Sequence, residues 1–142
     1  MELKNFGSIM TFAEQFEIHD QQFLQAAAQH PACADVVEQL NTIAADTAKF
    51  IKTVQRIRRE NVTEMILEGV SGFSTEPYDF TQTFAEDLTK GDVLSAIRRF
   101  EVRARDYYEA AAVKLKAQPE VARHLKRLAK KHVKHLSILE LI

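Results

Sequence analysis

Apolar side chains recur every three or four residues along four long stretches of the chain, which is the period of an α-helix with one buried face. Pro31 ends the first stretch and Pro119 opens the fourth. With four Gly and three Pro in 142 residues, the chain has few of the turn residues that an all-β fold needs. The sequence therefore predicts an all-α four-helix bundle, with helices over about residues 3–29, 34–60, 92–115 and 119–142.

The connections between these helices differ in length. The first and third are short, so each pair of helices that they join is expected to form an antiparallel hairpin. The middle connection spans about residues 61–91, beginning with VTEMILEG, which extends the helical pattern, and continuing with the loop-like SGFSTEPYDF. Asp92 is the expected N-cap of the helix that follows. We therefore expect one domain over residues 1–142, made of two hairpins joined by a long crossover.

The two halves of the chain repeat one pattern. EIHDQQFLQAAA at 17–28 matches EVRARDYYEAAA at 101–112, since both contain a Glu, an aromatic residue six positions later and three alanines. DVVEQLNTIA at 35–44 then matches EVARHLKRLA at 120–129. This ordered match predicts a bundle with internal two-fold similarity between residues 17–60 and 101–140.

Polar residues interrupt the apolar stripes at a few positions. An unpaired carboxylate inside a bundle is costly, so such a group must be paired, protonated or bound to a metal. Carboxylates and imidazoles that converge from different helices are ligands of iron, manganese and zinc. The candidate metal ligands are Glu17, Asp20, Glu101, His132 and His135. The alternative is that the two histidines bond only to Glu101, Glu17 or a tyrosine such as Tyr108, and that Asp20 makes local hydrogen bonds.

These motifs resemble the rubrerythrin branch of the ferritin-like superfamily. That family places a Glu, an aromatic pair six and seven residues later and small residues on its first and third helices, as in E-IHDQQ-FL-QAAA and E-VRARD-YY-EAAA here. Its fourth helix carries Leu-Ala-x-x-Glu-x-x-His, where this chain has LAKKHVKH. The resemblance implies a ferritin-like fold, a metal centre inside the bundle and ligand positions at Glu17, Glu101, His132 and His135.

The chain departs from the family pattern on the second helix. In IAADTAKF, Thr47 and Phe50 stand where the family has a Glu and a His that bind metal. A hydroxyl is a poor ligand and a phenyl ring is none, and His132 replaces a further carboxylate. We therefore expect a reduced site that holds at most one divalent ion of iron, manganese or zinc, with Asp20 as a compensating ligand.

Two functions remain open from the sequence. One is a divergent ferritin-like metalloprotein that handles oxygen, peroxide or metal ions; because the chain has one cysteine, Cys33, it would need an external electron donor. The other is a non-catalytic ferritin-like scaffold that has lost its metal. The resemblance makes a homodimer plausible for either.

Charge is unevenly distributed along the chain. Residues 1–97 contain 7 Lys and Arg against 15 Asp and Glu, whereas residues 98–142 contain 12 against 5. We interpret the basic end as a solvated face rather than a nucleic-acid surface, because it lacks interleaved glycine and aromatic residues. His19, His30 and His124 are expected at the surface. The chain has no long apolar run and no basic leader, so no membrane contact and a cytoplasmic location are expected.

Overall fold

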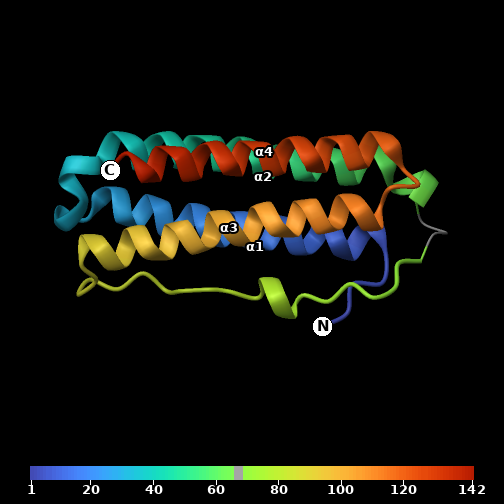
Figure 1. Cartoon of the computed structure of the whole chain (residues 1–142), viewed down its shortest axis with the longest axis horizontal. Coiled ribbons are helices and arrows are strands. Elements are labelled where there is room, and N and C mark those ends of the chain that lie inside the picture. The colour runs from blue at the N-terminus through green and yellow to red at the C-terminus, as the bar shows by residue number, and fades with distance from the viewer. Residues whose placement is uncertain (66–68) are drawn as a thin grey trace.

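Four long α-helices make up most of the computed structural model, which describes residues 1–65 and 69–142, without the side chains of residues 62–65. The elements in chain order are α1 (Phe6–Gln29), the 3₁₀-helix η1 (Pro31–Val36), α2 (Val37–Met65), the 3₁₀-helix η2 (Glu76–Tyr78), α3 (Lys90–Lys114) and α4 (Pro119–Glu140). α1 packs along α2, and α3 packs along α4 (Figure 1). The prediction of an all-α four-helix bundle is confirmed.

Several helix ends differ from the sequence-based expectation. α1 begins at Phe6 rather than near residue 3, because Asn5 caps it by accepting a hydrogen bond from the Ser8 amide at 2.8 Å. The prediction that Asp92 caps α3 is wrong. Thr89 is the N-cap, and Asp92 lies three residues further on, where each side chain bonds the backbone amide of the other at 3.1 Å.

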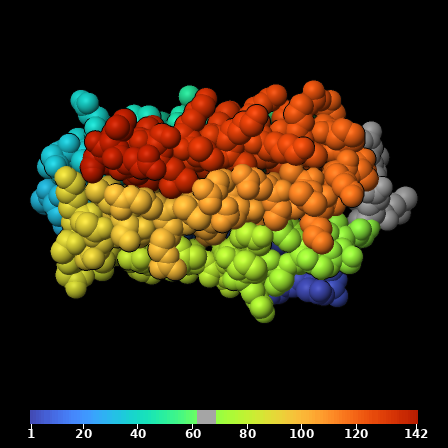
Figure 2. Space-filling model, viewed as in Figure 1, coloured from blue at the N-terminus to red at the C-terminus, as the bar shows by residue number. Residues whose placement is uncertain are grey.

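The connection between α2 and α3 runs along the whole length of the bundle (Figure 1). α2 ends at one end of the molecule and α3 begins at the other, so these two helices point in the same direction. Of the expected helical extension over VTEMILEG, residues 62–65 belong to α2, and residues 66–68 lie outside the described part of the chain. On the face shown in Figure 2, the crossover lies beside α3, on the side away from α4.

Aromatic and backbone contacts attach the crossover to α1 and α3. Phe73 stacks on Tyr107 with ring centroids 5.3 Å apart, and Phe84 packs edge-on against Phe23 at 5.3 Å. The residues before α1 pair with it as well, since the Leu3 amide donates to the Phe73 carbonyl at 2.8 Å. Among the described residues, no helix combines the length and the apolarity that a bilayer crossing requires.

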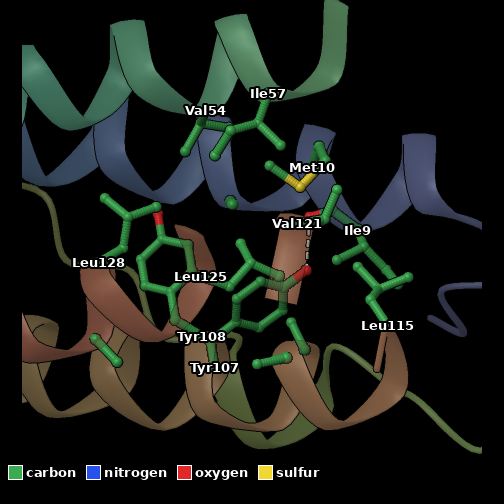
Figure 3. Packing of buried hydrophobic residues seen from close by; sticks show 14 of the residues in the cluster. Ile9, Met10, Val54, Ile57, Tyr107, Tyr108, Leu115, Val121, Leu125 and Leu128 are labelled. Carbon is green, nitrogen blue, oxygen red and sulfur yellow. Dashed lines mark hydrogen bonds between the residues drawn. The ribbon is translucent and has the colours of Figure 1, made fainter. Parts of the chain in front are cut away.

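The apolar core is divided into two clusters by a layer of buried polar residues. One cluster holds Met10, Val54, Ile57, Tyr107 and Leu125 with their neighbours (Figure 3). The other cluster lies at the opposite end of all four helices. Between the two, each helix contributes buried polar side chains, namely Glu17, Asp20, Thr47, Glu101, Arg103, His132 and His135. The bundle thus carries a polar layer near its middle.

Candidate metal centre

Three of the five predicted ligands converge inside the polar layer. His132 and His135 are one helical turn apart on α4 and face Glu101 on α3, and all three side chains are buried. One nitrogen or oxygen from each residue lies within 4.8 Å of those of the other two. We call these three residues the His₂Glu cluster.

Both histidines point the same ring nitrogen at the same carboxylate. Nδ1 of His132 lies 2.5 Å from Oε2 of Glu101, and Nδ1 of His135 lies 3.2 Å from each Glu101 oxygen. Two imidazole nitrogens and one carboxylate form a donor set that accepts iron(II) or zinc(II) with coordination positions left open. The donor types of the His₂Glu cluster therefore fit one divalent transition-metal ion.

The second nitrogen of each imidazole contacts a different carboxylate. Nε2 of His132 lies 3.0 Å from Oε2 of Glu17, and Nε2 of His135 lies 2.9 Å from Oδ2 of Asp46 on α2. Histidines that bind a metal usually donate their other N–H to a carboxylate or carbonyl, which fixes the ring and makes it more basic. Glu17 therefore lies behind His132 rather than beside the converging nitrogens, and it positions the ring.

Glu17 is completely buried and only partly satisfied. Its Oε2 accepts a hydrogen bond from the Tyr108 hydroxyl at 2.6 Å, in addition to the contact with His132. Among the described side chains, its Oε1 finds no hydrogen-bond donor. A buried carboxylate oxygen without a partner is costly, and this oxygen can accept a further hydrogen bond.

Electrostatics couples the members of this layer. Burial alone would raise the pKa of Glu101, but the charges and hydrogen bonds of His132 and His135 outweigh it and lower the pKa to about 2. Burial opposes protonation of His132, yet Glu17 and Glu101 raise its pKa to about 10. Burial and the charge of Glu17 raise the pKa of Tyr108 well above its usual value, so its hydroxyl stays protonated and donates. Without a metal, the layer therefore carries an imidazolium between two carboxylates.

Asp20, the fifth predicted ligand, lies outside the His₂Glu cluster. Its two oxygens accept hydrogen bonds from Nη2 of Arg103 at 2.5 and 2.6 Å, and His19 contacts it at 2.9 Å. Arg103 also donates to the Phe80 carbonyl at 2.8 Å and lies over the Phe16 ring. This buried ion pair therefore attaches the crossover to α1 and α3 and leaves Asp20 committed to Arg103.

The two α2 positions at which the resemblance implies metal ligands, Thr47 and Phe50, make other contacts. The Thr47 hydroxyl donates to the Ile43 carbonyl at 2.8 Å, one turn back on its own helix. The Phe50 ring packs 4.8 Å from the His132 ring and 5.4 Å from the His135 ring, measured between centroids. α2 thus faces the His₂Glu cluster with a phenyl ring.

Sequence reasoning missed Asp46 and Arg103. Asp46 directly precedes Thr47 and lies off the apolar stripe, so the stripe pattern excluded it even though its carboxylate reaches His135. Arg103 is one of several basic residues beside the apolar stripe of α3, with Arg98 and Arg105, so the stripe pattern does not single it out as the partner of Asp20. The histidines expected at the surface, His19, His30 and His124, are half-buried, and the first two bond backbone carbonyls of the crossover.

Comparisons with protein-family models, with curated proteins and with solved structures find no match to this chain.

Proposed function

We propose that this protein is a divergent ferritin-like metalloprotein that holds one divalent metal ion at the His₂Glu cluster. Glu101 and Nδ1 of His132 and of His135 would hold the ion. The observation that carries the proposal is the pairing of both outer nitrogens, His132 with Glu17 and His135 with Asp46, at 3.0 and 2.9 Å. In each histidine, one ring nitrogen contacts its own carboxylate and the other faces the shared carboxylate of Glu101. Proteins commonly orient metal-binding histidines by such a contact to the second ring nitrogen.

Metal content tests this proposal. Protein purified without an affinity tag or chelator, then incubated with Fe(II), Mn(II) or Zn(II) and desalted, should retain about one ion per chain. The His132→Ala/His135→Ala variant should lose it, whereas His124→Ala, a half-buried histidine of the same helix outside the cluster, should not. Absence of bound metal after incubation with all three ions would overturn the proposal.

Reaction with oxygen or peroxide suits this centre better than transport of metal ions. Glu101, His132 and His135 would hold iron(II) with coordination positions left open, and the ion would supply electrons for the reduction of oxygen or peroxide. The surface next to His135 carries Lys49, Lys131 and Lys134, whose charges repel an incoming cation. A resident ion is therefore favoured over a metal cargo, and repeated turnover would need an external electron donor.

A kinetic experiment tests this second step. Protein loaded with Fe(II) without oxygen is mixed with hydrogen peroxide, and the appearance of Fe(III) absorbance is followed. Oxidation should be faster than that of an equal concentration of free Fe(II) in the same buffer. A rate no faster than that of free Fe(II) would remove the peroxide role and leave metal binding intact.

The second candidate is a scaffold without a metal. Its support is that Phe50 packs against both imidazoles and that the charged groups of the layer largely satisfy one another. A folded protein that binds none of the three ions and whose stability is unchanged by chelator would favour this reading.

A further inference from the structure

A surface pocket of about 310 Å³ opens between α2 and α4 directly above His135. Its lining combines a charged rim with an aromatic floor and consists of Asp46, Lys49, Phe50, Lys131, Lys134, His135 and Ile138. This volume is at the lower end of the range that small-molecule sites occupy.

The three lysines of this pocket are not neutralised by nearby carboxylates. Among the described side chains, no carboxylate oxygen lies within 4.0 Å of their ammonium groups, and Asp46 is bonded to His135 instead. More positive charge lies further along α2 and α4, where burial and the charges of Arg127, Arg56 and Arg123 lower the pKa of His124. Unpaired ammonium groups around a concave surface attract anions and raise their local concentration.

We propose that this pocket binds a small oxyanion, a carboxylate or a phosphate, through Lys49, Lys131 and Lys134. Each ammonium group offers three N–H donors, and their charge-assisted hydrogen bonds to an anionic oxygen are the strong class of such bonds. Phe50 lines the pocket but is almost fully buried, and the Lys131 ammonium lies 6.0 Å from the centroid of its ring.

The pocket is connected to the His₂Glu cluster through two residues. Asp46 lines the pocket and accepts from Nε2 of His135, while Nδ1 of His135 faces Glu101. An anion beside Asp46 therefore changes the field at the imidazole that reaches the cluster. The anion site itself needs no metal; only this connection rests on the proposed function.

Anion binding is tested first on metal-free protein. Inorganic phosphate and succinate are titrated separately by calorimetry and by amide chemical shifts of ¹⁵N-labelled protein. We expect saturable binding of one anion per chain, with shift changes centred on residues 46–50 and 131–138. The Lys49→Gln/Lys134→Gln variant should weaken binding at least about ten-fold, because two charge-assisted contacts are lost. The matched control, Lys52→Gln/Lys130→Gln, removes two exposed charges of the same helices outside the pocket and should stay within about two-fold of wild type.

The relative affinities of the two probes identify the source of the oxyanion. Tighter binding of succinate assigns a carboxylate, and tighter binding of phosphate assigns a phosphate. The proposed anion site would be wrong if neither phosphate nor succinate binds saturably. It would also be wrong if both double variants lose the same amount of anion affinity. A short single-stranded oligonucleotide is included as a competitor. If it binds tightly and both double variants lower its affinity by the same factor, the basic surface of α2 and α4 binds polyanions in general, and the proposed site for a small anion is wrong.

The connection to the metal is tested separately on protein loaded with Co(II), whose visible spectrum reports its ligands. Adding the bound anion should change this spectrum in wild type and not in Lys49→Gln/Lys134→Gln. An unchanged spectrum with intact anion binding overturns the connection through His135. If Co(II) does not bind while the anion does, the proposed function fails and the anion site stands.

Discussion

Glu17 and Glu101, which are equivalent in the internal repeat and lie 84 residues apart, contact opposite nitrogens of one imidazole, that of His132. Their environments nevertheless differ. Glu101 faces a second histidine, His135, whereas Glu17 receives the Tyr108 hydroxyl and keeps one oxygen without a donor among the described residues. The two equivalent positions of the repeat therefore differ: Glu101 contacts both histidines, whereas Glu17 contacts only His132, at the nitrogen that points away from Glu101.

Asp46 is expected to tune the affinity of the metal without binding it. Asp46→Asn keeps the shape of the side chain but weakens the contact with Nε2 of His135, so the affinity for Zn(II) should fall about 10- to 100-fold, as for other partners of metal-binding histidines. Competition with a chromogenic chelator measures this. Glu38→Gln, an exposed carboxylate near the start of α2, is the control and should leave the affinity unchanged. If Asp46→Asn and the wild type bind Zn(II) with equal affinity, Asp46 does not influence metal binding.

The metal-free protein should be most stable in mildly acidic solution. The pKa of His132 is raised from 6.5 to about 10, so its stabilising charge is fully present below pH 6.5 and is lost as pH rises toward 10. The pKa of Glu101 is lowered from 4.5 to about 2, so its contribution is present above pH 4.5 and is lost as pH falls toward 2. Urea unfolding after chelator treatment should show a loss of about 1–3 kcal/mol between pH 6.5 and 8.5.

Variants identify the source of this dependence. His132→Gln should flatten the decline above pH 6.5, and His124→Gln should preserve it. A free energy of unfolding that rises over this interval in wild type would contradict a charged His132. Because the proton must leave before His132 can bind a metal, Zn(II) uptake at pH 7.5 should release protons into a weakly buffered solution.

Tyr107 and Tyr108 are neighbours on α3, and their hydroxyls have different acceptors. Tyr108 donates to the Glu17 carboxylate at 2.6 Å, and Tyr107 donates to the Ile9 carbonyl at 2.7 Å. Hydrogen bonds to charged groups contribute more, so Tyr108→Phe should cost about 1.5–3 kcal/mol and Tyr107→Phe about 0.5–1.5 kcal/mol of unfolding free energy. Urea unfolding measures the difference from the transition midpoints, provided that the dependence of the free energy on urea concentration is the same in all proteins. Equal losses in Tyr107→Phe and Tyr108→Phe would contradict a stronger hydrogen bond to the Glu17 carboxylate.

The buried pair of Arg103 and Asp20 should matter far more than exposed ion pairs. Arg103→Met leaves the Asp20 carboxylate buried without its main partner, at a cost of about 3–5 kcal/mol. Arg105→Met breaks only the half-exposed contact with Asp106, which should cost less than about 1 kcal/mol. Adding Asp20→Asn to Arg103→Met should restore part of the loss, because the uncompensated charge is removed. Chemical denaturation of the wild type, the two single arginine variants and the double variant measures these differences in unfolding free energy. If the double variant is as unstable as Arg103→Met, the loss comes from packing of the Arg103 side chain and not from the uncompensated charge of Asp20.

Helix periodicity and polar interruptions were sufficient to predict the four helices and the meeting of Glu101 with His132 and His135. The period of 3.6 residues fixes which side chains face inward, so the stripe positions carried that information. Asp46 could not be found in this way, because it reaches His135 from the edge of α2 rather than from its inward face. Asp20 satisfied the pattern, but its partner Arg103 depends on how α1 and α3 pack, which periodicity does not determine. The start of α3 was misplaced because Thr89 and Asp92 are both good capping residues and only their reciprocal bonding decides between them.

Phe50 is the position at which the centre can be enlarged by one substitution. Its ring lies against both imidazoles of the His₂Glu cluster, so Phe50→His places a third imidazole beside His132 and His135. Zinc prefers four ligands in closed sites, and a third histidine should therefore raise the affinity for Zn(II) at least about ten-fold. Phe50→Leu, which removes the ring without adding a nitrogen, separates ligand gain from loss of packing and should not tighten binding. Competition titrations at one pH compare the three proteins, and an affinity of Phe50→His no greater than that of Phe50→Leu would show that a side chain at position 50 does not bind the ion proposed for the His₂Glu cluster.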